Sequence, residues 1–196
     1  MRGLKYTIKP HKSYYLTMTI VEWIDLFTRL NMKRVMTESL NYCIENKGLN
    51  VFGWCLMSNH LHLMANTDSK IELSDVIRDF KKFTSKKLTE KIVSEPESRR
   101  KWLLDNFAFN ARIHPKNKIY KVWQDGNHAI DIYSEKVAWQ KLNHIHQNPV
   151  RAEIVAKPED YLFSSARDYH GIESLVKVNC LTPRLITVGS KDFFRT

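Results

Sequence analysis

The alternation of apolar and polar residues predicts four elements in the first half of the chain. Residues 13–21 (SYYLTMTIV) are rich in aromatic and β-branched side chains, which indicates a strand with one buried face. Apolar positions then recur at helical spacing over 33–46, and Gly48 follows as a stop signal. Residues 51–65 are apolar on both sides of the polar pair at 58–59, which predicts two antiparallel strands joined by a tight turn.

The middle of the chain is expected to form a basic amphipathic helix. Over residues 72–92, apolar side chains recur on one helical stripe and cationic side chains occupy the remaining faces. The stripe consists of Leu73, Val76, Ile77, Phe80, Phe83, Leu88 and Ile92. Residues 93–118 carry mixed charge, and we expect a loop-rich excursion there with a short helical patch around 102–104.

Turn signals divide the last third of the chain into short elements. Short strands or edges are predicted at 120–123 and 128–132, on either side of a turn at 125–127. Ser134 is a favourable N-cap for the following helix, which is expected to end before Pro149 because the residue preceding a proline is disfavoured in the helical conformation. One further short helix is expected near 164–169.

Composition narrows the class of protein. The chain has 196 residues, of which 43% are hydrophobic, and we interpret residues 1–172 as one α+β domain, with a C-terminal tail at 173–196 of no predictable form. The three cysteines are isolated, so neither a disulfide framework nor a cysteine zinc site is expected. No apolar stretch approaches the ~18 residues that cross a bilayer, and the N-terminus lacks an apolar signal core. A cytoplasmic protein is therefore expected.

The formal net charge of +10 indicates a polyanionic partner, either nucleic acid or an acidic membrane surface. A membrane-surface protein needs a helix with an exposed apolar face, whereas the apolar stripe of 72–92 is needed for the core. Nucleic acid is therefore favoured, and Trp123 and Tyr120 are candidates for stacking unpaired bases, with burial of Trp123 as the alternative. The candidate phosphate contacts are Lys81, Lys82, Lys86, Lys87 and Arg151.

Two histidines are the candidate chemical groups in the predicted hairpin. His60 and His62 lie two residues apart in a strand, so both side chains leave the same face and can reach one metal ion. Leu61 between them points to the opposite face. Taken alone, the pair is a weak signal, and ordinary surface histidines are the more frequent explanation of such a pair.

Longer segments around these histidines resemble one family. Residues 54–63 (WCLMSNHLHL) and 143–152 (NHIHQNPVRA) resemble the two signature segments of the REP-associated tyrosine transposases, which are single-tyrosine HUH transposases. The resemblance extends through 122–126 (VWQDG) and 158–166 (PEDYLFSSA). It implies a ferredoxin-like antiparallel sheet with helices packed on it. It also implies a metal-dependent endonuclease and strand-transfer activity on single-stranded or hairpin DNA in DNA transposition.

The resemblance assigns roles to individual residues. His60 and His62 would bind Mg²⁺ or Mn²⁺, and Asn148 would be the amide ligand. The family's tyrosine stands four residues before Asn148, one helical turn away, where this chain has His144. In the family the phenol attacks a phosphodiester and forms a 5′-phosphotyrosine. Without a thiolate, this ligand set suits Mg²⁺ or Mn²⁺ better than a structural zinc ion.

Replacement of the tyrosine by His144 leaves three readings open. The first is a DNA-binding relative that has lost strand transfer. The second is metal-assisted hydrolysis, with the imidazole itself on the metal. In the third, which we rank last, the neutral imidazole attacks phosphorus.

The remaining tyrosines and histidines are weaker candidates. Tyr133 would lie about three turns, or roughly 16 Å, from the tyrosine position along the same helix, too far to serve the same metal. Tyr161 and Tyr169 are expected to pack or to contact DNA, and His146 and His128 are interpreted as structural. Both a monomer and a homodimer are compatible with the sequence.

Overall fold

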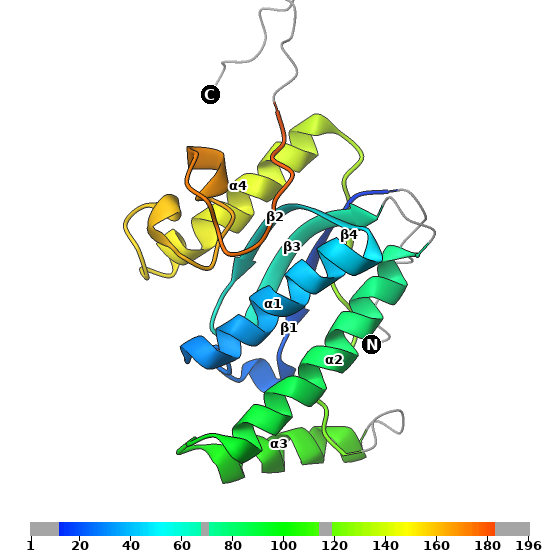
Figure 1. The fold of residues 1–196 in the computed structure, drawn as a ribbon, viewed down its shortest axis with the longest axis vertical. Coiled ribbons are helices and arrows are strands. Elements are labelled where there is room, and N and C mark those ends of the chain that lie inside the picture. Colours follow the sequence, from blue (N-terminus) through cyan, green and yellow to red (C-terminus); the bar gives the residue numbers. More distant parts are fainter. Residues whose placement is uncertain (1–11, 68–70, 114–118, 183–196) are drawn as a thin grey trace, which may run out of the picture.

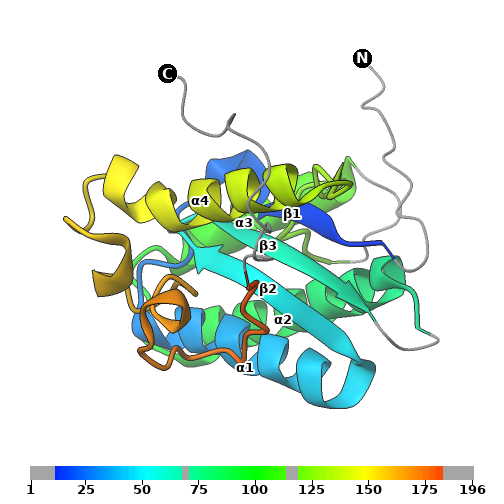
Figure 2. The ribbon, with the colours of Figure 1, turned by 90° about the horizontal axis from the view of Figure 1, so that it is seen from above.

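Four strands form one antiparallel sheet in the order β2-β3-β1-β4. The computed structural model describes residues 12–67, 71–113 and 119–182. The strands are β1 (Tyr14–Thr19), β2 (Leu49–Leu56), β3 (His60–Thr67) and β4 (Ile130–Asp131). Helices α1 (Leu30–Lys47) and α2 (Leu73–Ser94) cover one face of the sheet, and α4 (Glu135–Arg151) crosses the other (Figures 1 and 2). The predicted α+β fold is confirmed.

The predicted β2–β3 hairpin is confirmed, with its turn at Ser58 and Asn59. The register places Leu56 opposite Leu61, and a bulge interrupts it between Val51 and Gly53. A Cβ at Gly53 would lie 2.6 Å from Leu142 Cδ1 of α4. Glycine at this position therefore lets the helix approach the sheet closely.

The two helices on the core face match the sequence expectations. Helix α1 (Leu30–Lys47) ends at Gly48, which adopts the left-handed conformation with φ of 65°. Helix α2 (Leu73–Ser94) buries the expected stripe with one exception. Phe83 is exposed, and Thr84 is buried in its place because its hydroxyl accepts a hydrogen bond from Trp123 Nε1 at 3.1 Å.

Two expectations about helices are wrong. The segment expected to be rich in loops contains α3 (Arg100–Arg112), because Leu103, Phe107 and Ala111 recur at four-residue intervals and bury one face. Helix α4 (Glu135–Arg151) runs through Pro149 instead of ending before it. The last turn continues beyond the proline, since Ala152 N–H donates to Asn148 O at 3.0 Å.

The segment 119–129 lies along the edge of β1 and forms little regular strand. Thr17 N–H donates to Asn127 O at 2.8 Å, and Gln124 N–H donates to Thr19 O at 2.8 Å. Of the short strand or edge predicted at 120–123, the structure has the edge, with a single bridge that joins Trp123 to Ile20. Of the strand predicted at 128–132, only β4 is regular.

The chain after α4 returns to the sheet in short 3-10 turns. These are η2 (Pro158–Asp160) and η3 (Asp168–His170), so the helix expected near 164–169 is reduced to one turn. Packing continues past the predicted domain end at 172, because Val176 is buried and Asn179 N–H donates to Val51 O at 2.8 Å. Most of the predicted tail lies outside the described residues. Within the described ranges, no helix is both long and apolar enough to cross a membrane.

Candidate functional site

The two histidines of β3 converge on one point beneath α4. The strand sends Leu61 and Leu63 into the core and turns His60 and His62 to the opposite face. Their Nε2 atoms lie 3.0 Å apart, and their rings meet edge to face with centroids 4.6 Å apart. His60 and His62 therefore lie on the same face of β3, as the sequence predicts.

Neighbouring side chains fix the orientation of both rings. His62 Nδ1 lies 2.8 Å from Tyr15 Oη and 3.1 Å from Thr17 Oγ1, both on β1. His60 Nδ1 lies 2.7 Å from Asn59 Oδ1, which can only accept, so the proton of a neutral His60 is on Nδ1. Nε2 of His60 therefore carries the lone pair of the ring and faces Nε2 of His62 at 3.0 Å, as in histidines that bind a metal through one nitrogen and donate through the other.

Sequence reasoning missed Tyr15 and Thr17. Their positions follow from the pairing of β1 with β3, which places Thr17 opposite His62 and Tyr15 opposite Met64. Alternate residues of a strand share a face, so a correct strand pairing would have put both hydroxyls beside His62. The sequence pattern predicts the alternation of β1 but does not show that β3 is its neighbour in the sheet.

Helix α4 brings His144 and Asn148 over the histidine pair. The His144 ring centroid lies 5.5 Å from that of His62 and 6.0 Å from that of Tyr15. Asn148 Nδ2 donates to His144 O at 2.8 Å, which leaves its Oδ1 for His62. Because the helix continues through Pro149, Arg151 also remains beside His144, with Nη1 3.3 Å from Nδ1.

All three site histidines are neutral near pH 7. Burial, reinforced by the nearby His60 and His144, lowers the pKa of His62 to about 3, and a hydrogen bond to Asn148 acts in the opposite direction. Burial and His144 lower the pKa of His60. Burial, Arg151 and Lys141 lower the pKa of His144. Neutral imidazoles are the form that binds a metal ion, so this site needs no deprotonation to do so.

The two histidine nitrogens have the spacing of two ligands on one divalent ion. Two nitrogens bound at right angles to one octahedral ion, each at ~2.1 Å, are ~3.0 Å apart. The two Nε2 atoms have that separation, 3.0 Å, before any ion is bound. Among the described residues, no group of three or more His, Cys, Asp or Glu side chains is arranged to hold a metal. A third protein ligand would therefore come from an amide such as that of Asn148, and His144 does not complete a three-histidine site.

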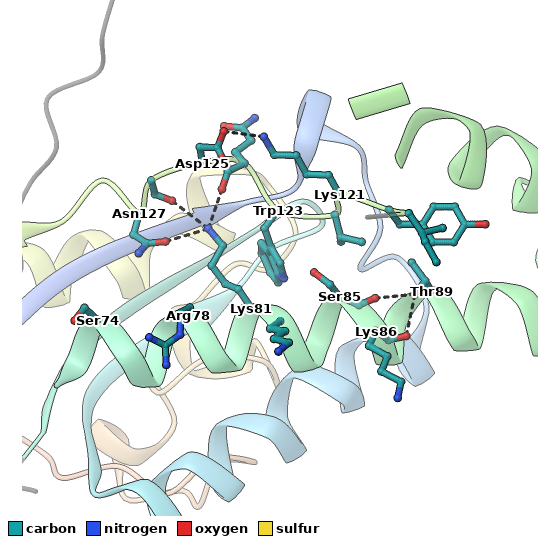
Figure 3. Close-up of a pocket in the computed structure, with 16 residues that line it drawn as sticks. Ser74, Arg78, Lys81, Ser85, Lys86, Thr89, Lys121, Trp123, Asp125 and Asn127 are labelled. Carbon is teal, nitrogen blue, oxygen red and sulfur yellow. Dashed lines mark hydrogen bonds and ion pairs between the residues drawn. The ribbon is translucent and has the colours of Figure 1, made fainter. Parts of the chain in front are cut away.

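The candidate DNA contacts divide into exposed and buried groups. Lys82, Lys86 and Lys87 are exposed on α2, and Arg151 is exposed on α4 beside His144. Lys81 turns inward, where its Nζ donates to Gln124 O, Gly126 O and Asn127 Oδ1 at 2.8, 3.1 and 3.1 Å (Figure 3). Burial lowers the pKa of Lys81 to about 8.

Trp123 is buried between the same segment and α2. Its Nε1 donates to Thr84, and its ring lies near Lys81 Nζ. Of the two expectations for Trp123, stacking on a base or burial in the core, the structure has burial. A groove of about 570 Å³ lies between α2 and the segment 119–127, and Lys82 and Lys86 are among its lining residues.

The other tyrosines have different surroundings. Tyr161 and Tyr169 pack in the tail, where their hydroxyls donate to Leu56 O at 2.8 Å and to Phe52 O at 2.7 Å. Tyr133 is 77% exposed at the start of α4. The Tyr15 hydroxyl is buried and meets His62 on Nδ1, the side of the ring away from the paired Nε2 atoms.

The two histidines interpreted as structural have different surroundings. His146 is buried, with its Nε2 2.9 Å from Ser165 Oγ, as expected for a packing residue. His128 is exposed in the turn before β4 with φ of 39°. Neither lies at the histidine pair.

Comparisons with known proteins agree on family and fold. One solved structure, of a REP-associated tyrosine transposase bound to a REP hairpin, matches with a TM-score of 0.60 and 15% identity, over 94% of this chain and 96% of the other. At that identity the likeness establishes the shared fold. No curated protein matches the sequence. The sequence profile described as "Transposase IS200 like" matches residues 12–114. Because that match spans more than half of the chain, the protein belongs to the IS200-like transposase family.

Proposed function

We propose that this protein recognises hairpin or single-stranded DNA and holds one of its phosphates at a divalent metal ion. His60, His62 and Asn148 are the ligands, and Mg²⁺ or Mn²⁺ is the ion. We further propose that the protein does not carry out tyrosine-mediated strand transfer. The observation that carries the proposal is the convergence of the two Nε2 atoms, 3.0 Å apart, under a helix whose nearest ring is His144 rather than a tyrosine.

Charge and surface support a DNA partner. The net charge of +10 attracts a polyanion, and exposed lysines of α2 line a groove beside the sheet. Lys82, Lys86, Lys87 and Arg151 remain the proposed phosphate contacts. The fold is shared with a transposase whose solved structure holds a REP hairpin, which favours a hairpin as the DNA form.

The metal ion would neutralise charge on the phosphate oxygens when bound. The residues of this chain prepare that site. Asn59 and Tyr15 orient the two imidazoles, and burial keeps both neutral. Asn148 is held by its bond to His144 O.

His144 is poorly arranged to act as a nucleophile. Arginine only donates, so Arg151 Nη1 donates to Nδ1 of His144 and the proton of the neutral ring is on Nε2. Neither nitrogen then offers a free lone pair to phosphorus. Metal-assisted hydrolysis is the second candidate function, because a metal-bound phosphate and a neutral imidazole would stand side by side.

A denaturing gel after incubation with a labelled hairpin and Mn²⁺ tests the proposal. The natural protein should shift the hairpin on a native gel but form no covalent adduct. His144→Tyr should form a Mn²⁺-dependent adduct, and adding His60→Ala to that variant should abolish it. His144→Phe is the matched control, since it supplies a ring without a nucleophile.

Each alternative has its own result in this experiment. An adduct with the natural protein would contradict the loss of strand transfer, and cleaved DNA without an adduct would favour hydrolysis. Absence of any hairpin shift would overturn the DNA-binding function itself. The cytoplasmic location and the choice between monomer and homodimer stay predictions.

A further inference from the structure

An exposed tryptophan lies at the edge of the histidine pair. Trp23 ends the 3-10 turn η1 (Val21–Trp23) and is 59% exposed. Its ring centroid lies 6.1 Å from that of His60, with an interplanar angle of 71°. Tryptophan combines a large apolar ring with a polar N–H and is enriched at binding interfaces, so its position beside His60 makes this ring a candidate contact for a ligand.

The backbone holds this ring outward against its own preference. Glu22 and Trp23 both have φ of 53°, in the left-handed region that side chains other than glycine disfavour. Such strain persists only where surrounding contacts enforce it, and it is concentrated at functional sites. Here the backbone of Trp23 is held by two hydrogen bonds, from its N–H to Ile20 O and from Asn59 Nδ2 to its carbonyl, each of 3.1 Å.

Asn59 connects the tryptophan with the metal-site histidine. The same side chain that donates to Trp23 O accepts from His60 Nδ1 at 2.7 Å. One amide therefore sets both the position of the indole and the tautomer of His60. Two neighbouring groups of one bound molecule could therefore contact His60 and the indole of Trp23 at the same time.

Open surface continues from Trp23 toward the lysines of α2. A cavity of about 370 Å³ is lined by Glu22, Trp23 and Asn110 together with Gln124. Gln124 also lines the larger groove beside α2. The two hollows thus share a wall, and together they lead from Trp23 to the cationic side chains of α2.

We propose that Trp23 is a stacking platform for the unpaired nucleobase next to the phosphate held at His60 and His62. The inference rests on the proposed function and names the part of the DNA that this edge of the site recognises. An indole stacks on any base because every base has a π face, so the platform would select unpaired over paired nucleotides without reading sequence. The single-stranded segment beside a hairpin supplies such a base.

Fluorescence anisotropy with two hairpins tests this inference. One hairpin carries a short single-stranded extension and the other is blunt, and both are titrated with protein in Mn²⁺, with a parallel titration in EDTA as the reference without metal. Trp23→Ala should weaken binding of the extended hairpin by roughly 5- to 150-fold and leave the blunt hairpin unchanged. Trp23→Phe should restore most of the affinity, because a smaller aromatic ring still stacks.

Trp102→Ala is the matched control, since Trp102 is 50% exposed on α3. It should bind both hairpins like the natural protein. Thermal unfolding of Trp23→Ala checks that the fold survives, and Trp23→Phe keeps the test decisive if the alanine variant does not.

The outcomes separate the inference from the proposed function. Equal weakening on both hairpins, or none on either, would overturn the stacking role while hairpin binding by the natural protein upheld the function. If the natural protein binds neither hairpin, the proposed function fails and the inference falls with it. A dimer that dissociates on Trp23→Ala, seen by light scattering, would show that a second copy of the chain covers the indole and would also overturn the inference.

Discussion

The two faces of the sheet are built by the same strands but have opposite properties. On β3, Leu61 and Leu63 are fully buried on the face covered by α1 and α2. His60 and His62 lie on the other face, which α4 crosses. Helices α1 and α2 cover the apolar face, and α4 crosses the polar face (Figure 2). On β3, odd-numbered positions therefore contribute to the stability of the core, and even-numbered positions carry the candidate chemical groups.

Polar groups on the α4 face are organised rather than solvated. His62 is 5% exposed and has hydrogen-bonding partners at both ring nitrogens. Burial lowers the pKa of the His62 imidazole and so keeps it neutral, and this has a stability cost in acid that the leucine face does not have. The comparison therefore makes separate predictions for the two faces.

The largest effect is expected on the leucine face. Leu63→Ala should lower the free energy of unfolding by about 2–5 kcal/mol, because it removes fully buried methyl groups and leaves a cavity. Urea unfolding measures this loss. Leu162→Ala is the control, since Leu162 is 42% exposed and its truncation should cost within about 0.5 kcal/mol. A similar loss at both positions would contradict the contrast between core and surface.

Acid should destabilise the α4 face next most strongly. Burial lowers the pKa of His146 to about 4, so between pH 6.5 and 4 the unfolded chain binds a proton that the folded chain does not. Stability is complete above pH 6.5 and falls with decreasing pH by up to ~1.4 kcal/mol per pH unit for each such histidine.

Replacement of this histidine isolates its share of the pH dependence. His146→Gln should flatten the stability profile between pH 6 and 5 by about 1.4 kcal/mol per pH unit. Urea unfolding at several pH values measures the slope. His128→Gln, at an exposed position, should leave it unchanged. An unaltered slope in His146→Gln would mean that this ring is protonated in the folded protein.

The smallest effect is expected from the hydroxyl behind His62. Tyr15→Phe removes the partner 2.8 Å from His62 Nδ1, and Mn²⁺ affinity should fall by about tenfold, while Thr17 retains part of the orientation. The Mn²⁺-dependent rise in melting temperature measures it. Tyr14→Phe on the opposite side of β1 is the matched control, and the double variant His60→Ala, His62→Ala should show no rise. Equal affinity in the Tyr15 and Tyr14 variants would contradict the positioning role.

Local sequence patterns are enough to predict several elements of this fold. The hairpin at 49–67 follows from two apolar runs around a polar turn, and α1 and α2 follow from helical periodicity. The shared face of His60 and His62 follows from strand geometry alone. These features depend on neighbours a few residues apart, which a single sequence displays directly.

Contacts between residues far apart in the sequence could be established only from the tertiary structure. Tyr15 and Thr17 reach His62 through the pairing of β1 with β3, which no local pattern encodes. Lys81 and Trp123 are turned inward because the segment 119–127 packs on α2. Helix α4 continues past Pro149 because that residue is buried and the next turn still forms. Long-range contacts outweigh local preferences, which are about 1 kcal/mol for most residues and about 3 kcal/mol for a proline inside a helix, and those contacts cannot be read from a residue's own neighbourhood in the sequence.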